Sequence, residues 1–250
     1  MQEINPLHGD NPWPEIRKER INIVLPQAMK AAGVDAWMVV CRENNNDPIA
    51  HHVGGENAGG TAVFLFQLEG IEFKSIVFSP IGEATALADL KIHDEVKPIA
   101  RGKSAIEAAA EYAISKNFSK IAVNSSEDNE MADGLSYTQR KALEDAFGPS
   151  ATKFVSSNEL LYEWLSIKLP AEVEIMRLAA QLTSDWQYEA YKQVEPGKST
   201  DADIAKFLKN KIAEYGFKDG WAADQNPNVN SGPDRGHSHA TDKVIMPGDV

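Results

Sequence analysis

Cysteine is almost missing from this chain of 250 residues, which contains a single one, Cys41. A lone cysteine excludes a disulfide within the chain and any zinc site built from several cysteines. Cys41 ends the largely apolar segment 35–41. We therefore expect a buried thiol in a strand rather than a nucleophile.

Long hydrophobic runs are also missing, because no segment approaches the roughly 18 apolar residues that cross a membrane. Residues 1–6 contain neither the basic region nor the apolar stretch of a signal peptide. These features predict a cytoplasmic protein that does not bind membranes. A mature exported form would have the same N-terminal sequence.

Positive charge is in short supply, since 25 lysines and arginines stand against 37 aspartates and glutamates, for a formal net charge of −12. An acidic surface is not attracted to nucleic acid or anionic lipid, so neither is an expected partner. Most of the carboxylates are expected only to keep the protein soluble. Hydrophobic residues make up 42% of the chain and charged residues 25%, which indicates a folded globular protein.

The first part of the chain alternates helical and extended patterns. A helix is expected over 15–32, with an interruption at Pro26, and a buried strand over 37–40. Two extended segments flank Glu69-Gly70 as a hairpin. Further expected helices cover 82–90, 104–116 and 136–147, and further strands cover 96–100 and 120–123. This alternation predicts an α/β domain with a parallel or mixed sheet.

The pattern changes after Ser157, and we place the domain boundary there, giving domains 1–157 and 158–250. Helices are expected over 159–167, from Pro170 to about Val194, and from a capping signal at Thr200 to Gly216. Six apolar positions of the long helix follow helical spacing and predict one buried stripe: Ile175, Leu178, Ala179, Leu182, Trp186 and Ala190. Two helices and one strand cannot enclose a core, so this part is expected to be marginal alone.

Three segments resemble a single enzyme family. Residues 167–179, Ile-Lys-Leu-Pro-Ala-Glu-Val-Glu-Ile-Met-Arg-Leu-Ala, resemble the opening helix of the catalytic domain in the creatinase, Xaa-Pro aminopeptidase and prolidase family, the "pita-bread" metallopeptidases. Residues 33–40, Gly-Val-Asp-Ala-Trp-Met-Val-Val, are similar to the start of its N-terminal domain. Residues 221–250 are similar to the entrance of its active site. The resemblance implies a creatinase-type N-terminal α/β domain followed by the start of a pita-bread α+β catalytic domain.

The resemblance gives a catalytic role to one of two histidines, His237 and His239. In the family this histidine binds no metal, and it donates a hydrogen bond to the substrate carbonyl or the tetrahedral intermediate. His237 precedes Asp249 by twelve positions and His239 follows Gly232 by seven, and each spacing matches the family. We favour His237 because the residues after it resemble the family, and His239 is the second candidate. Without the family, two histidines so close in a loop are more often a surface feature.

The resemblance also implies two divalent metal ions (manganese, zinc or cobalt), held in the complete protein by two aspartates, a histidine and two glutamates. All five ligands are expected after Val250, so this chain is expected to hold no metal ligand. Asp224, Asp234 and Asp242 match no ligand position, and Asp249 is expected in a turn.

The function implied is that of a metal-dependent peptidase that cleaves Xaa-Pro peptides or dipeptides and forms a homodimer. One alternative is a creatinase-like amidinohydrolase or another non-peptidase homologue, and a second is a non-catalytic dimerisation module. The other histidine pair, His51-His52, is not expected to share a metal, because neighbouring side chains on a helix or strand point apart. Capping or core packing is the expected role of that pair.

Overall fold

The computed structural model describes residues 11–249 except 221–222, 224–225 and 234–237. The chain divides into two compact units, Gly9–Glu172 and Val173–Val250. The first eight residues lie outside the described part.

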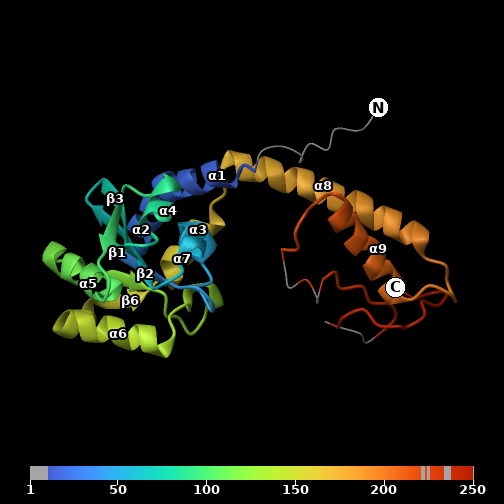
Figure 1. Ribbon diagram of the computed structural model, residues 1–250. Coiled ribbons are helices and arrows are strands. Elements are labelled where there is room, and N and C mark those ends of the chain that lie inside the picture. The colour runs from blue at the N-terminus through green and yellow to red at the C-terminus, as the bar shows by residue number, and fades with distance from the viewer. Residues whose placement is uncertain (1–10, 221–222, 224–225, 234–237, 250) are drawn as a thin grey trace. The chain divides into compact units, whose positions relative to one another are not determined.

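A mixed six-stranded sheet organises the described residues of the first unit (Figure 1). Its strand order is β4-β3-β2-β1-β5-β6. The strands are β1 Ala36–Cys41, β2 Ala62–Glu69, β3 Glu72–Pro80, β4 Glu95–Ile99, β5 Ile121–Val123 and β6 Phe154–Ser156. β2 and β3 form the predicted antiparallel hairpin, while β5 runs parallel to both β1 and β6. The predicted α/β fold with a mixed sheet is therefore confirmed.

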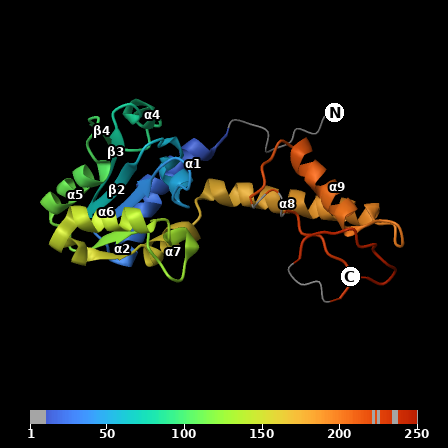
Figure 2. The ribbon, with the colours of Figure 1, turned by 60° about the horizontal axis from the view of Figure 1, so that its bottom comes forward.

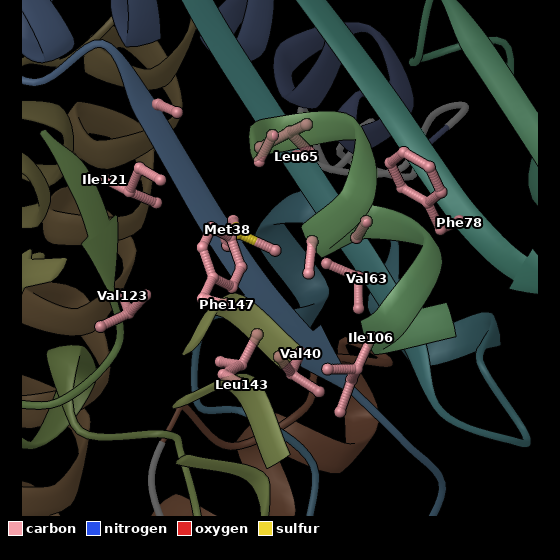
Figure 3. Close-up of a cluster of buried hydrophobic side chains, with 14 of the residues drawn as sticks. Met38, Val40, Val63, Leu65, Phe78, Ile106, Ile121, Val123, Leu143 and Phe147 are labelled. Carbon is pink, nitrogen blue, oxygen red and sulfur yellow. The ribbon is translucent and has the colours of Figure 1, made fainter. Parts of the chain in front are cut away.

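Helices α5 (Ala105–Lys116) and α6 (Tyr137–Phe147) cover one face of this sheet (Figure 2). Ser104 caps α5, and Ser136 and Gln139 form a capping box at the start of α6. Alternate residues of β1 and β2 point toward these helices, because successive side chains of a strand lie on opposite faces. Figure 3 shows the resulting apolar core, which includes Met38, Val40, Val63, Leu65, Phe78, Ile106, Leu143 and Phe147.

The opposite face of the sheet is covered by the other helices of the unit. They are α1 Trp13–Glu19, α2 Leu25–Ala32, α3 Ala50–Val53, α4 Ala84–Asp89 and α7 Asn158–Ser166. Short 3-10 turns occupy Gly55–Asn57, Glu130–Ala132 and Gly148–Lys153. The indole rings of Trp37 and Trp164 are fully buried on this side, with centroids 5.5 Å apart. Cys41 is buried in β1 as expected, and burial raises the pKa of its thiol.

The interruption expected at Pro26 is a π-helical turn, η1 (Arg20–Val24), between α1 and α2. The Leu25 N–H donates to the Arg20 carbonyl five residues earlier, and Pro26 then occupies the first turn of α2. A proline lacks the N–H of a regular helical hydrogen bond and its ring crowds the carbonyl four residues earlier, so the helix passes Pro26 through the π-helical turn. Helical backbone thus continues from α1 through η1 into α2.

The first unit extends to Glu172, whereas the sequence placed the boundary after residue 157. The reason is that α7 buries Leu160, Leu161 and Trp164 in the first unit. Arg20, only 2% exposed, then fastens the segment that follows. Its Nη1 donates to the Ile167 carbonyl at 2.9 Å and to Glu172 Oε2 at 2.8 Å, and its Nη2 donates to the Trp164 carbonyl.

The adjacent histidines His51 and His52 pack against aromatic rings, as expected. The His51 ring stacks on Trp13 with centroids 5.1 Å apart, and the His52 ring meets Trp164 edge-on at 5.9 Å. Burial lowers the pKa of His52 to about 4. The pair therefore belongs to the packing of the first unit.

A buried polar network joins Trp37 of β1 to the residues that directly follow β5 and β6. Asn124 donates to both carboxylate oxygens of Asp47 at 3.0 Å, and accepts from Trp37 and from Ser157, each at 2.8 Å. The Ile49 N–H also donates to Asp47 at 3.0 Å. Burial nevertheless raises the pKa of Asp47 to about 6, because desolvation outweighs these hydrogen bonds.

This shift gives Asp47 a measurable effect on the pH dependence of stability. The native carboxyl binds a proton more tightly than the unfolded one, so its ionisation destabilises the fold as pH rises from about 4 to above 6. We expect the unfolding free energy of the wild type, relative to Asp47→Asn, to fall by roughly 2–3 kcal/mol across this window. Denaturant unfolding of both proteins at pH 4.5, 5.5, 6.5 and 7.5 measures the difference.

The comparison also removes the contribution of two buried histidines. Burial lowers the pKa values of His52 and His93 to about 4, which makes stability fall toward acid pH, but both proteins share them. Any constant cost of the substitution likewise leaves the slope unchanged. A difference between the two proteins that does not vary with pH would contradict the raised pKa of Asp47.

The second unit contains most of α8 (Pro170–Gln193) and all of α9 (Asp201–Glu214). A capping box between Thr200 and Asp203 starts α9, as predicted. The expected strand is reduced, among the residues described here, to an isolated antiparallel bridge between Thr200 and Val244.

The prediction of one continuous buried stripe on α8 is wrong. Of its six positions only Trp186 and Ala190 are buried, and Leu178 is 38% exposed. Helical spacing places these side chains on one face, but whether that face is buried depends on what packs against it. The described residues of this unit cover only its second half, where the Trp186 ring meets that of Tyr215 at 5.0 Å and that of Phe217 at 6.3 Å.

Candidate active-site entrance

Only one of the two candidate histidines lies in the part of the chain that the structure describes. His237 lies outside the described residues. His239 is exposed, and its Nδ1 lies 3.0 Å from Asn228 Oδ1. An asparagine amide offers both an acceptor and a donor, so Asn228 can orient the imidazole in either tautomer.

His239 borders a shallow pocket of about 310 Å³ beside α9. One wall consists of residues 205, 206, 209 and 210 of α9, and the other of residues 223, 226 and 227 together with His239 and Ala240. Lys206 and Lys209 both line the α9 wall, and Lys209 is paired with Asp219. The pocket therefore combines an imidazole with one ammonium group, that of Lys206, at a concave surface.

Lys209 holds the loop that forms the second wall. Its Nζ donates to Asp219 Oδ1 at 2.7 Å, to the Ala223 carbonyl at 2.8 Å and to the Asn226 carbonyl at 3.3 Å. Asn226 Nδ2 donates to the same Asp219 oxygen at 2.9 Å. The hydrogen bond from Lys209 and that from Asn226 lower the pKa of Asp219. The Lys209 ammonium group thus holds the loop that contains Asn228.

The segment after His239 is fastened to the start of α9. Asp201 is fully buried, and its carboxylate accepts from the Thr241 N–H at 2.8 Å and the Thr241 hydroxyl at 3.3 Å. Backbone hydrogen bonds join Gly197 to Ile245 at 2.7 Å and Ile245 to Ser199 at 2.9 Å. These contacts fix the backbone on the C-terminal side of His239.

A lysine and a turn complete the entrance. Lys243 Nζ donates to the Ser231 carbonyl and lies 3.9 Å from an Asp249 carboxylate oxygen. Asp249 Oδ2 accepts from the Met246 N–H at 2.9 Å, and the Asp249 N–H donates to the Met246 carbonyl at 3.1 Å. Asp249 therefore lies in a turn, where the resemblance places it.

The described residues contain no group of three or more His, Cys, Asp or Glu side chains that could hold a metal ion. Asp242 is exposed, and Asp224 and Asp234 lie outside the described part. The residues that build the entrance, Lys209, Asn228 and Lys243, were not found from the sequence. Lone lysines and asparagines in a polar loop give no periodic or spacing signal, because their role depends on contacts made by folding.

No helix in the described part of the chain is both long and apolar enough to cross a membrane. No protein-family model matches the chain, and no curated protein sequence does. The similarity of this chain to known proteins is therefore found by comparing three-dimensional structures.

Solved structures of proline-specific peptidases share the fold of this chain. A dipeptidase PepE from Mycobacterium ulcerans matches with a TM-score of 0.62 at 17% identity, covering 94% of this chain and 59% of its own. A Xaa-Pro dipeptidase from Bacillus anthracis matches at 0.59 and 18% identity, with the same two coverages. An X-Pro aminopeptidase from Thermotoga maritima matches at 0.59 and 19%, covering 89% of this chain and 58% of its own.

The chain thus has the fold of solved Xaa-Pro dipeptidases and aminopeptidases over nearly its whole length. The resemblance to the creatinase, Xaa-Pro aminopeptidase and prolidase family is confirmed at the level of the fold. The chain spans somewhat less than three fifths of the length of these structures.

Proposed function

We propose that this chain belongs to a hydrolase that cleaves Xaa-Pro dipeptides or peptides, and that it supplies the N-terminal domain and the first part of the catalytic domain. The observation that carries the proposal is the fold similarity, which covers 94% of the chain and therefore both units. The opening-helix motif within α8 and the turn at Asp249 lie where the resemblance places them, which supports it further.

In this proposal the entrance orients the peptide. His237 or His239 donates a hydrogen bond to the substrate carbonyl, or to the oxygen that becomes negative in the tetrahedral intermediate. Asn228 holds the His239 ring, and Lys209 holds the loop that carries Asn228. Lys206 on the α9 wall suits the free carboxylate of a dipeptide, whereas the three ammonium donors of Lys209 are already used within the loop.

The described residues do not fit the two divalent ions that the resemblance implies, since no group of ligands is present among them. We assign no step to a metal here. In this proposal the metal ligands belong to other parts of the complete protein. The complete protein is proposed to work as a homodimer.

A comparison of the complete protein with the chain of 250 residues tests this function. We expect the complete protein to hydrolyse alanyl-proline in the presence of Mn²⁺, and a chelator to abolish the turnover. The shorter chain is expected to show no hydrolysis above background. Release of free proline measures both, with alanyl-glycine as the matched substrate.

Each contrary outcome has a separate meaning. Chelator-sensitive turnover by the chain of 250 residues would contradict the placement of the metal ligands. Turnover of creatine without alanyl-proline cleavage by the complete protein would replace the peptidase with the amidinohydrolase. A complete protein that dimerises but hydrolyses neither substrate would leave the non-catalytic module as its function.

A further inference from the structure

A second pocket, of about 270 Å³, lies in the first unit at the ends of two neighbouring strands. Residues 80–82, where β3 ends, form one side of this pocket, and residues 99–103, where β4 ends, form the other. The Ile81 N–H donates to the Ile99 carbonyl at 2.9 Å and joins the two loops. A turn from Ala100 to Lys103, closed by a 3.0 Å hydrogen bond, forms the rest of the second side.

The connections that follow β3 and β4 leave the sheet toward opposite faces beside this pocket. β3 and β4 are parallel, but the helices that follow them cover opposite faces. α5 packs into the core of Figure 3, whereas the residues after α4 contact the other side, where the His93 ring lies 5.3 Å from that of Phe64. Two adjacent parallel strands whose connections leave to opposite faces create a crevice at their carboxyl ends, which is where open α/β sheets bind ligands.

The charge at this crevice has the opposite sign to that of the chain. Arg101 and Lys103 line it and no acidic residue does, although the chain carries a net charge of −12. Neither cation forms an ion pair with any residue that the structure describes. The carboxylate of Glu83 accepts hydrogen bonds from the Gly59 and Gly60 amides at 3.0 and 2.8 Å and does not line the crevice.

One further feature favours an anion with an apolar body. The N-terminus of α5 does not contribute, because Ser104 caps it by accepting from the Glu107 N–H and Glu107 is the acidic residue of its first turn. Opposite the charges, Pro80, Ile81 and Ile99 offer apolar surface, and Ile81 is 54% exposed.

We propose that this crevice binds a small phosphorylated molecule that carries an apolar group. The phosphate contacts Arg101 and Lys103, because a dianion between a guanidinium and an ammonium group makes strong charge-assisted hydrogen bonds. The apolar group covers Ile81 and Ile99. The site is separate from the peptidase entrance, so it does not depend on the proposed function.

Titration of the 250-residue chain with phenyl phosphate tests the proposal. Amide ¹H–¹⁵N spectra report binding through the Ile81, Gly82 and Gly102 signals. We expect saturable shifts of these amides, with phenyl phosphate bound about tenfold more tightly than inorganic phosphate because of its ring. Arg101→Gln/Lys103→Gln is expected to weaken phenyl phosphate binding by at least about tenfold.

The matched control is Lys18→Gln/Lys30→Gln, which removes the same charge from two exposed lysines of α1 and α2. We expect its affinity to equal that of the wild type. Equal weakening in both double variants would show a general effect of net charge and overturn the site. Shifts that do not saturate, or that appear elsewhere in the spectrum, would also overturn it. Thermal unfolding of each variant verifies that the fold is retained.

Discussion

Arg20→Ala is expected to lower the unfolding free energy of the first unit by about 3–5 kcal/mol. Arg20 is almost fully buried, and it supplies donors to two backbone carbonyls and to the Glu172 carboxylate. Removing it leaves the Trp164 and Ile167 carbonyls without the arginine donors, and it takes from the partly buried Glu172 carboxylate one of two donors, the other being the Leu169 N–H. The cost of such a loss exceeds the net contribution of the ion pair, because the remaining groups stay away from water.

Amide hydrogen exchange of the β1 and β5 residues measures this effect, because the slowest amides report unfolding of the unit that contains them. The matched control is Lys141→Ala, which breaks an ion pair with Asp145 in the same unit whose side chains are 58% and 66% exposed. An exposed pair contributes about 0–1 kcal/mol, so this variant should remain close to the wild type. Equal losses in both variants would refute the structural role of Arg20.

Substitution of the entrance histidines has the second large effect, provided that the complete protein is the proposed peptidase. We expect His237→Ala to reduce kcat/KM for alanyl-proline by roughly 10²–10³-fold, the loss typical of one donor to a developing oxyanion. His239→Ala is expected to cost about tenfold, and Asn228→Ala to cost the same, because Asn228 orients that ring. Steady-state kinetics of the three variants measures the losses.

Asp242→Ala serves as the control for this series. Asp242 is exposed in the same segment and matches no ligand position of the family, so its removal should leave kcat/KM within about twofold of the wild type. Full activity in both histidine variants would contradict the assigned entrance while leaving the fold untouched. A larger loss at His239 than at His237 would exchange the roles of the two.

Local signals in the sequence identified most elements of the fold. The capping box at Thr200, the hairpin around Glu69-Gly70 and the interruption at Pro26 depend on residues within a few positions of each other. The end of the first unit does not, because it depends on a contact between Arg20 and residues 144 to 152 positions later. Periodicity likewise placed apolar residues on one face of α8 but could not show that half of it stays uncovered.

The site was less predictable than the fold. Family resemblance identified the segment and the turn at Asp249, whereas Asn228, Lys209 and Lys243 gained roles only through contacts across loops. The histidine that the resemblance favours, His237, lies outside the described residues, so its role stays a prediction. The residues whose hydrogen bonds organise the candidate entrance could therefore be identified only from the structure.

The contacts of Arg20 also bear on how the polypeptide folds during synthesis. This arginine lies in the helical segment 13–32, but its acceptors lie at positions 164, 167 and 172, so they are synthesised at least 144 residues later. Until those residues leave the ribosome, the guanidinium group stays hydrated. The contact between this helical segment and the end of α7 is thus one of high sequence separation, which forms only after residue 172 has been made.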